Sequence, residues 1–206
     1  MNFKHYNGKK LVAWIVVLFI IESILLARIN PILDKLDKPW KQIIDITALF
    51  GSLSFVYLIL ELYDKYLWTY LPSWLNLVSV PNVNGAYEGE LISSFKDAQG
   101  NPVVRTCLMQ IHQTASDIFI EMEFFNENMK TTSRSHSEQI ENYRGQYFIL
   151  QFVHLNDGNY DDKDLNMHKG LTTLKYYPAT KEFKGDYFND PHRKTYGKLN
   201  VKKKEG

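Results

Sequence analysis

The chain lacks cysteine almost entirely, since Cys107 is the single one among 206 residues. One cysteine cannot form an intramolecular disulfide, so no cystine framework holds the fold, and a reducing compartment suits the soluble part. An excess of charge of one sign is also missing, because 24 Lys and Arg oppose 23 Asp and Glu for a net charge of +1. A duplex-binding protein normally shows a basic patch, and the only clear basic run here is the terminal Lys202-Lys203-Lys204. The composition therefore predicts no binding of DNA or RNA.

Motifs for catalysis and metal binding are absent as well. There is no nucleophile elbow, no phosphate-cradling Gly-Lys-Ser and no Cys/His arrangement. No two histidines have the short spacing of a zinc site: the second half holds His112, His136, His154, His168 and His192. The acidic loop 157–164 lacks the glycine and the terminal glutamate of a calcium loop. We therefore expect no enzyme activity, no metal and no cofactor.

Two long apolar stretches dominate the first third, over Leu11–Ile29 and about Ile43–Leu62. At a rise of about 1.5 Å per residue, some 19–20 residues cover most of a hydrocarbon core of about 30 Å. A signal peptide is the alternative for the first stretch, but no small-x-small cleavage site follows and a second apolar stretch comes at once. We predict a two-helix membrane anchor over residues 1–70, with Asn30-Pro31 ending the first helix.

Polar and small residues within these stretches suggest an assembly face. Glu22 lies near the middle of the first span, where an ionised group costs about 2.5–3.5 kcal/mol. It is either a tolerated residue or part of a self-association face. Ala48 and Ser52 make a small-xxx-small pair that allows close helix approach. Lysines lie on both sides of the spans, so charge leaves the orientation open, while two spans put both termini on one side.

After a linker at 71–84, the pattern changes to short strands separated by turn signals. Period-2 alternation is clear in several of them, as in Ile118, Ile120, Met122 and Phe124. Antiparallel strands without intervening helices favour a closed up-and-down β-barrel over 85–202, and a β-sandwich is the alternative. The eight predicted strands cover 85–95, 102–115, 117–127, 130–142, 145–156, 168–178, 181–189 and 192–202.

Alternation also places polar side chains on the strand faces that carry core hydrophobes. Arg193 is the costly one, because an unpaired buried arginine is unfavourable. It is either solvated or paired at the barrel rim, or it binds an anion inside. In the second case Arg193 would hold phosphate, hydroxyls would add hydrogen bonds and a tyrosine would stack on a base. The candidate ligand-binding residues are Tyr87, Gln113, Ser133, Ser135, His168, Thr172, Tyr187, Arg193 and Thr195.

The order of these features resembles a known family. After the two apolar stretches come Val80-Pro81-Asn82-Val83-Asn84-Gly85-Ala86-Tyr87-Glu88-Gly89-Glu90-Leu91, Ile111-x-Gln113-Thr114, Ser133-x-Ser135-x-Ser137, His168-x-Gly170, Gly185-x-Tyr187 and Arg193-x-Thr195-x-Gly197. Together they resemble the two-transmembrane, β-strand-rich, SMODS-associated effectors of CBASS antiphage defence, over essentially the whole chain.

The resemblance implies a multi-pass protein of the bacterial inner membrane, with both termini and the β-barrel in the cytoplasm. The barrel would bind a cyclic dinucleotide made by a cognate nucleotidyltransferase (CD-NTase). Binding would then drive homo-oligomerisation of the spans, membrane disruption and abortive infection. Two other interpretations stay open: a membrane-anchored, lipocalin-like carrier of an apolar ligand without toxic activity, and a structural protein whose barrel is an interaction module.

Overall fold

The computed structural model describes residues 3–33, 51, 53–126, 129–157, 168–191 and 194–204. These residues form two compact units. Unit 1 comprises residues 1–79 together with the turn 114–116, and unit 2 comprises residues 80–113 and 117–206. Each unit is considered by itself below.

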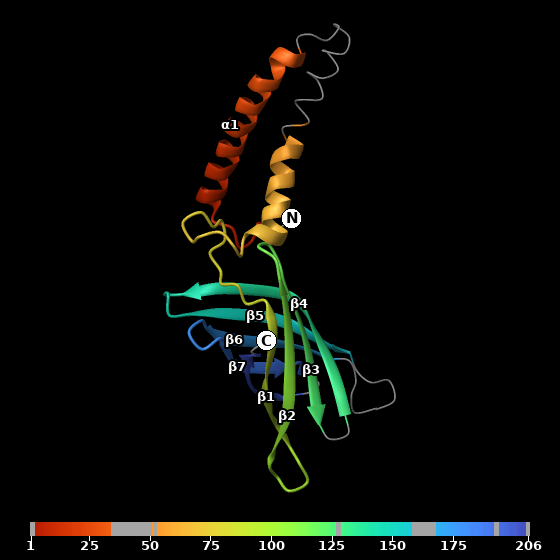
Figure 1. The fold of residues 1–206 in the computed structure, drawn as a ribbon. Helices are drawn as coiled ribbons and strands as arrows, with labels where there is room; N and C mark the ends of the chain where they lie inside the picture. Colours follow the sequence, from red (N-terminus) through yellow and green to blue (C-terminus); the bar gives the residue numbers. More distant parts are fainter. Residues whose placement is uncertain are drawn as a thin grey trace. The chain divides into compact units, whose positions relative to one another are not determined.

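Unit 1 contains α1 (Gly8–Leu33), shown in red in Figure 1. Among the described residues one helix is long and apolar enough to cross a membrane, over Gly8–Ile29. Its apolar side chains are largely exposed, among them Val12 and Ile20 at 62% and 54%. The prediction that the first helix ends at Asn30-Pro31 is wrong, because α1 runs to Leu33. A proline in the last turn removes little helical hydrogen bonding, so the helix can pass it.

The second predicted span lies partly outside the described residues, which omit 34–50 and 52. Residues 53–62 are helical and continue into a π-helical turn, η1 (Tyr63–Leu67). Leu18 of α1 belongs to the same buried cluster as Val56 and Leu60, so the two helices share an apolar contact. The second span stays a prediction, and Ala48 and Ser52 lie outside the described residues.

A buried polar cluster ends the helical part of unit 1. Asp64 of η1 is 7% exposed, and its carboxylate accepts hydrogen bonds from Tyr6, at 3.0 Å, and from Ser116. The Asp64 carbonyl accepts the Ala115 amide at 3.0 Å. Burial and the neighbouring carboxylate raise the pKa of Tyr6 above its usual value. Tyr6 therefore acts only as a neutral donor here.

Unit 2 is a closed antiparallel barrel, drawn from yellow-green to blue in Figure 1. Each strand pairs with the next, and the last pairs with the first through contacts such as Leu199 with Leu91. Closure confirms the predicted eight-stranded barrel and excludes the β-sandwich. The strands are β1 (Gly85–Lys96), β2 (Pro102–Gln113), β3 (Ile118–Asn126), β4 (Met129–Tyr143), β5 (Tyr147–Asp157), β6 (His168–Tyr177), β7 (Glu182–Asn189) and β8 (Tyr196–Lys203).

Several strand boundaries differ from those predicted. β8 begins at Tyr196 rather than at residue 192, because the chain turns at Lys194, where φ is +50°. β5 begins at Tyr147 rather than at 145, after a turn with positive φ at Arg144 and Gly145. β2 ends at Gln113 rather than at residue 115, because the Ala115 amide donates to the Asp64 carbonyl instead of to a neighbouring strand. Such turns use left-handed backbone positions that side-chain alternation does not reveal.

The two ends of the barrel differ in what they enclose. We call the end where β1 begins, with the turns 144–146 and 178–181, the linker end. The opposite end, with the turns 97–101 and 190–195, is the far end. Aromatic and aliphatic side chains fill the linker end and the middle: Tyr87 and Phe183 make an edge contact with ring centres 5.1 Å apart, and Tyr176 lies 4.7 Å from Phe183.

Candidate ligand-binding site

Polar side chains collect inside the far end of the barrel. Backbone register makes Ser135, His154, Gly170 and Asn189 successive partners across β4, β5, β6 and β7. The next row of register partners toward the middle begins at Phe152 on β5. It continues across β6, β7 and β8 to β1. The far-end polar cluster consists of Ser133, Ser135, His154, Thr172, Asn189 and Thr195.

His154 is the centre of this cluster and is only 5% exposed. Its Nδ1 lies 3.0 Å from the Thr172 hydroxyl, and its Nε2 lies 3.0 Å from Oδ1 of Asn189. The Asn189 amide nitrogen donates in turn to the Thr195 hydroxyl at 2.6 Å. A chain of hydrogen bonds therefore crosses β5, β6, β7 and the turn before β8.

The protonation of His154 follows from this chain together with burial. Because Asn189 presents its oxygen, the His154 Nε2–H donates to it. In the neutral imidazole Nδ1 then accepts from the Thr172 hydroxyl. Burial lowers the pKa of His154 below its usual value, partly offset by the hydrogen bond with Asn189. The site therefore presents an uncharged imidazole at neutral pH.

The two predicted serines, Ser133 and Ser135, are buried, and both form hydrogen bonds to the backbone of neighbouring strands. The Ser133 hydroxyl donates to the Leu155 carbonyl at 3.2 Å, and the Ser135 hydroxyl accepts the Ile120 amide at 2.8 Å. Ser135 stands where the β4–β5 register shifts between Ser135 and Ser137. Its hydroxyl accepts an amide of β3, on the other side of β4 from this register shift, and its own proton stays able to donate.

Arg105 brings a positive charge to the same end. It alternates with Cys107 and Met109, which are buried inside the barrel, and it opposes Leu91 of β1 in register. It is half-buried and lies two residues from Cys107 toward the far end. Within the described residues Arg105 has no ion-pair partner. A guanidinium in this place can bind an anion by two parallel hydrogen bonds.

Two predicted ligand residues lie at the opposite end from this cluster. Tyr87 is fully buried beside the apolar core, and its hydroxyl donates to the Val83 carbonyl at 2.8 Å. The Gln113 amide accepts the Val83 amide at 2.7 Å and donates to the Pro81 carbonyl at 3.1 Å. Both side chains hold the segment that leads into β1, and they do not join the far-end polar cluster.

The other predicted residues that the structure describes belong to the far end. Thr172 is 1% exposed and binds His154. Tyr187 opposes Thr172 across β6 and β7 and is 7% exposed. The His168 ring makes an edge contact with the His154 ring, with centres 6.5 Å apart. Arg193 lies outside the described residues, so its predicted role stays a prediction.

Sequence reasoning missed His154, Asn189 and Arg105. The signal for two of them was available, because His154 continues the alternation of Leu150 and Phe152, and Arg105 continues that of Cys107. Asn189 has no such signal, because its role depends on the neighbours that the closed sheet provides.

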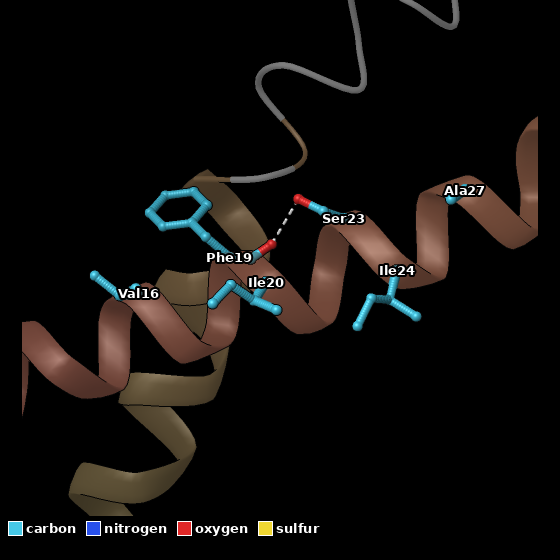
Figure 2. Close-up of a pocket in the computed structure, with 6 residues that line it drawn as sticks. All are labelled: Val16, Phe19, Ile20, Ser23, Ile24 and Ala27. Atoms are coloured by element: carbon cyan, nitrogen blue, oxygen red, sulfur yellow. Dashed lines mark hydrogen bonds between the residues drawn. The ribbon is translucent and has the colours of Figure 1, made fainter.

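Two other features of the described residues do not form a competing site. An open groove along α1 is lined by side chains of that helix alone, and Ser23 donates to the Phe19 carbonyl at 2.8 Å (Figure 2). Its lining is apolar except for Ser23, whose hydroxyl already donates to the Phe19 carbonyl, and it carries no cationic group for an anion: Val16, Phe19, Ile20, Ser23, Ile24 and Ala27. Within the described residues, no group of three or more His, Cys, Asp or Glu is placed to hold a metal ion.

Comparison with known proteins identifies the family to which the barrel belongs. No curated protein matches the chain. The model of one protein family, described as "Cap15, cyclic dinucleotide receptor domain", matches residues 78–203. The match covers the whole barrel and more than half of the chain. The chain therefore belongs to the family of Cap15 cyclic dinucleotide receptor domains.

Proposed function

We propose that the far end of the barrel binds a cyclic dinucleotide, and that binding activates the chain as a CBASS effector at the bacterial inner membrane. The observation that carries the proposal is the far-end polar cluster around neutral His154, with the half-buried Arg105 on the inner face at the same end. A barrel of eight strands leaves room for side chains or one small ligand.

The chemistry of the cluster suits the parts of a cyclic dinucleotide. Arg105 would bind a phosphate oxygen pair, and the Ser and Thr hydroxyls would bind phosphate or ribose oxygens. Tyr187 and the two histidine rings offer faces for base stacking. His154 would keep its donor and acceptor roles for base edges once the ligand displaces Thr172 or Asn189 from it.

Activation would follow from differential binding. A ligand changes an equilibrium only when it binds one state better than the other. In our proposal the ligand favours barrels that associate, and the apolar helices then assemble and disrupt the inner membrane. Glu22 is buried within one copy of the chain, at 9% exposure, and in our proposal assembly would turn it toward the face between copies, together with the predicted pair Ala48 and Ser52. The cognate CD-NTase would supply the ligand, and the barrel and both termini would lie in the cytoplasm.

Calorimetric titration of the full chain in detergent with a panel of cyclic dinucleotides tests binding. We expect one member to bind selectively and His154→Ala to weaken it. Glu123→Gln, on the outer face of β3, serves as the matched control. Binding of fatty acids in place of nucleotides would overturn the proposal in favour of the carrier interpretation.

Dye release from liposomes that contain the full chain tests the activation step separately. We expect release only with the selected cyclic dinucleotide, and we expect Glu22→Leu to reduce release without changing ligand affinity. If the chain binds the ligand with full affinity but releases no dye in any lipid mixture, its proposed role as a receptor stands and the proposed membrane disruption is overturned.

A further inference from the structure

The linker end of the barrel carries a cluster of tyrosines and cations on its outer face, in which Tyr143 is exposed and the other two tyrosines are half-buried. The rings of Tyr143 and Tyr147 stack with centres 5.0 Å apart and planes 18° apart. Tyr177 of β6 continues the row, 6.0 Å from Tyr147. This row and its two cations, Arg144 and Lys175, form what we call the aromatic–basic patch.

The cations lie over the rings. The Arg144 guanidinium carbon is 5.6 Å from the centre of the Tyr143 ring, and Lys175 Nζ is 5.1 Å from that of Tyr147. Both side chains are exposed, and Tyr143 is 42% exposed. A cation–π contact positions each charge without neutralising it. The patch therefore presents ordered aromatic edges and two available positive charges to a partner.

The β4–β5 turn fixes the patch in place. Arg144 adopts φ of +51°, and the Gly145 amide binds Oδ1 of Asn142 at 2.8 Å. The Gln146 amide closes the turn on the Tyr143 carbonyl at 3.1 Å. Because this tight turn holds the rings of Tyr143 and Tyr147 in their stacked arrangement, the patch is preorganised for binding.

The surrounding charge at the linker end is also positive. Lys181 and Lys202 are exposed there, whereas Lys184 and Lys204 are paired with Glu182 and Glu88. On the patch side, Glu141 is exposed on β4 and accepts a hydrogen bond from Gln139. Cations thus outnumber carboxylates around the patch, so an anionic partner is complementary to it.

We propose that the aromatic–basic patch docks the linker end of the barrel onto the headgroups of anionic phospholipids. This inference rests on the proposed membrane anchor. Tyrosine is enriched at the membrane–water interface, and Lys or Arg near an anionic leaflet is attracted to it. The linker end is also where the chain arrives from the unit that contains α1. Lipid docking would control which barrel surfaces are free to associate when ligand binds.

Fluorescence quenching of the full chain in lipid nanodiscs tests the docking. A fluorophore on Gln146→Cys reports the patch, and one on Gln99→Cys, in the far-end turn, is the matched control. Cys107 stays unlabelled, because it is fully buried and burial raises the pKa of its thiol to about 12. The quencher is a lipid with a spin-labelled headgroup, in phosphatidylcholine alone or mixed with phosphatidylglycerol.

We expect strong quenching at position 146 with phosphatidylglycerol, weaker quenching without it or at high salt, and little at position 99. Removing both cations with Arg144→Gln and Lys175→Gln should lower the ratio of docked to undocked barrel about thirtyfold. Lys169→Gln, at the far end, should not change it. Equal quenching at both labelled positions, or no dependence on phosphatidylglycerol, would overturn the docking.

A third label separates docking from the anchor on which it rests. A fluorophore on Ile20→Cys in α1 should be quenched by lipids brominated on their acyl chains. Quenching at position 20 without quenching at 146 would overturn docking alone. Absence of quenching at position 20 would overturn the membrane anchor itself.

Discussion

The imidazole of His154 lies directly against the backbone of Gly170, its register partner on β6. A Cβ on residue 170 would lie 2.4 Å from both Cε1 and Nε2 of His154, and 2.3 Å from the Phe188 carbonyl oxygen. Only glycine leaves room at this place for the ring and the neighbouring strand together. The missing side chain therefore permits the hydrogen-bond chain from Thr172 through His154 to Asn189.

Gly170→Ala should disrupt the ligand site. The added methyl group must displace the His154 ring or the β7 backbone, and overpacking of this kind costs about 1–3 kcal/mol. We expect a lower melting temperature and at least about tenfold weaker binding of the cyclic dinucleotide, as His154 loses its partners. Gly8→Ala, where a Cβ meets open space, is the control. If Gly170→Ala lowers the melting temperature but leaves the affinity for the cyclic dinucleotide unchanged, His154 does not belong to the ligand site.

The stability of the barrel should fall in mild acid because of His154. Its pKa in the folded chain lies below the ordinary 6.5, so the unfolded chain binds the proton more readily. Stability is therefore full above about pH 6.5 and decreases as the pH falls from there toward the lowered pKa of the folded chain. Urea unfolding of the full chain across this range measures the slope. His154→Gln should reduce the slope, and an equal slope in that variant would assign the acid sensitivity elsewhere.

Much of the barrel could be predicted from side-chain alternation. Ile118, Ile120, Met122 and Phe124 are all buried, as their period-2 spacing predicts. Turn signals separated the strands, and the connections without helices favoured antiparallel neighbours. The exact ends of β5 and β8 were missed because Arg144 and Lys194 take left-handed conformations that glycine usually marks.

The site was harder to predict because it depends on register. Alternation shows that Tyr87 and Thr172 both point inward, but only the pairing of strands shows that they lie at opposite ends. Asn189 and Thr195 meet because a turn folds one beside the other. A one-residue change in register would move each to a different neighbour, so the sequence alone cannot assemble the cluster.

Arg105→Gln should weaken ligand binding without destabilising the barrel. The guanidinium has no ion-pair partner within the described residues, so its removal breaks no ion pair seen there. Loss of charge-assisted hydrogen bonds to phosphate is expected to reduce affinity about 10- to 100-fold. Arg134→Gln, on the exposed face of β4 beside Glu121, is the matched control. Calorimetry and thermal melting measure both effects, and equal affinities of the two variants would exclude Arg105 from the site.

Tyr87→Phe and Tyr187→Leu should distinguish the roles of the two ends of the barrel. The Tyr87 hydroxyl is buried, and its loss leaves the Val83 carbonyl without the 2.8 Å hydrogen bond, at a cost of about 1–3 kcal/mol. We expect Tyr87→Phe to lower the melting temperature and leave ligand affinity unchanged. Tyr187→Leu, beside Thr172, removes the ring that we propose stacks on a base and should weaken ligand binding. A loss of affinity in Tyr87→Phe without loss of stability would extend the ligand site to the linker end, as the sequence alone suggested.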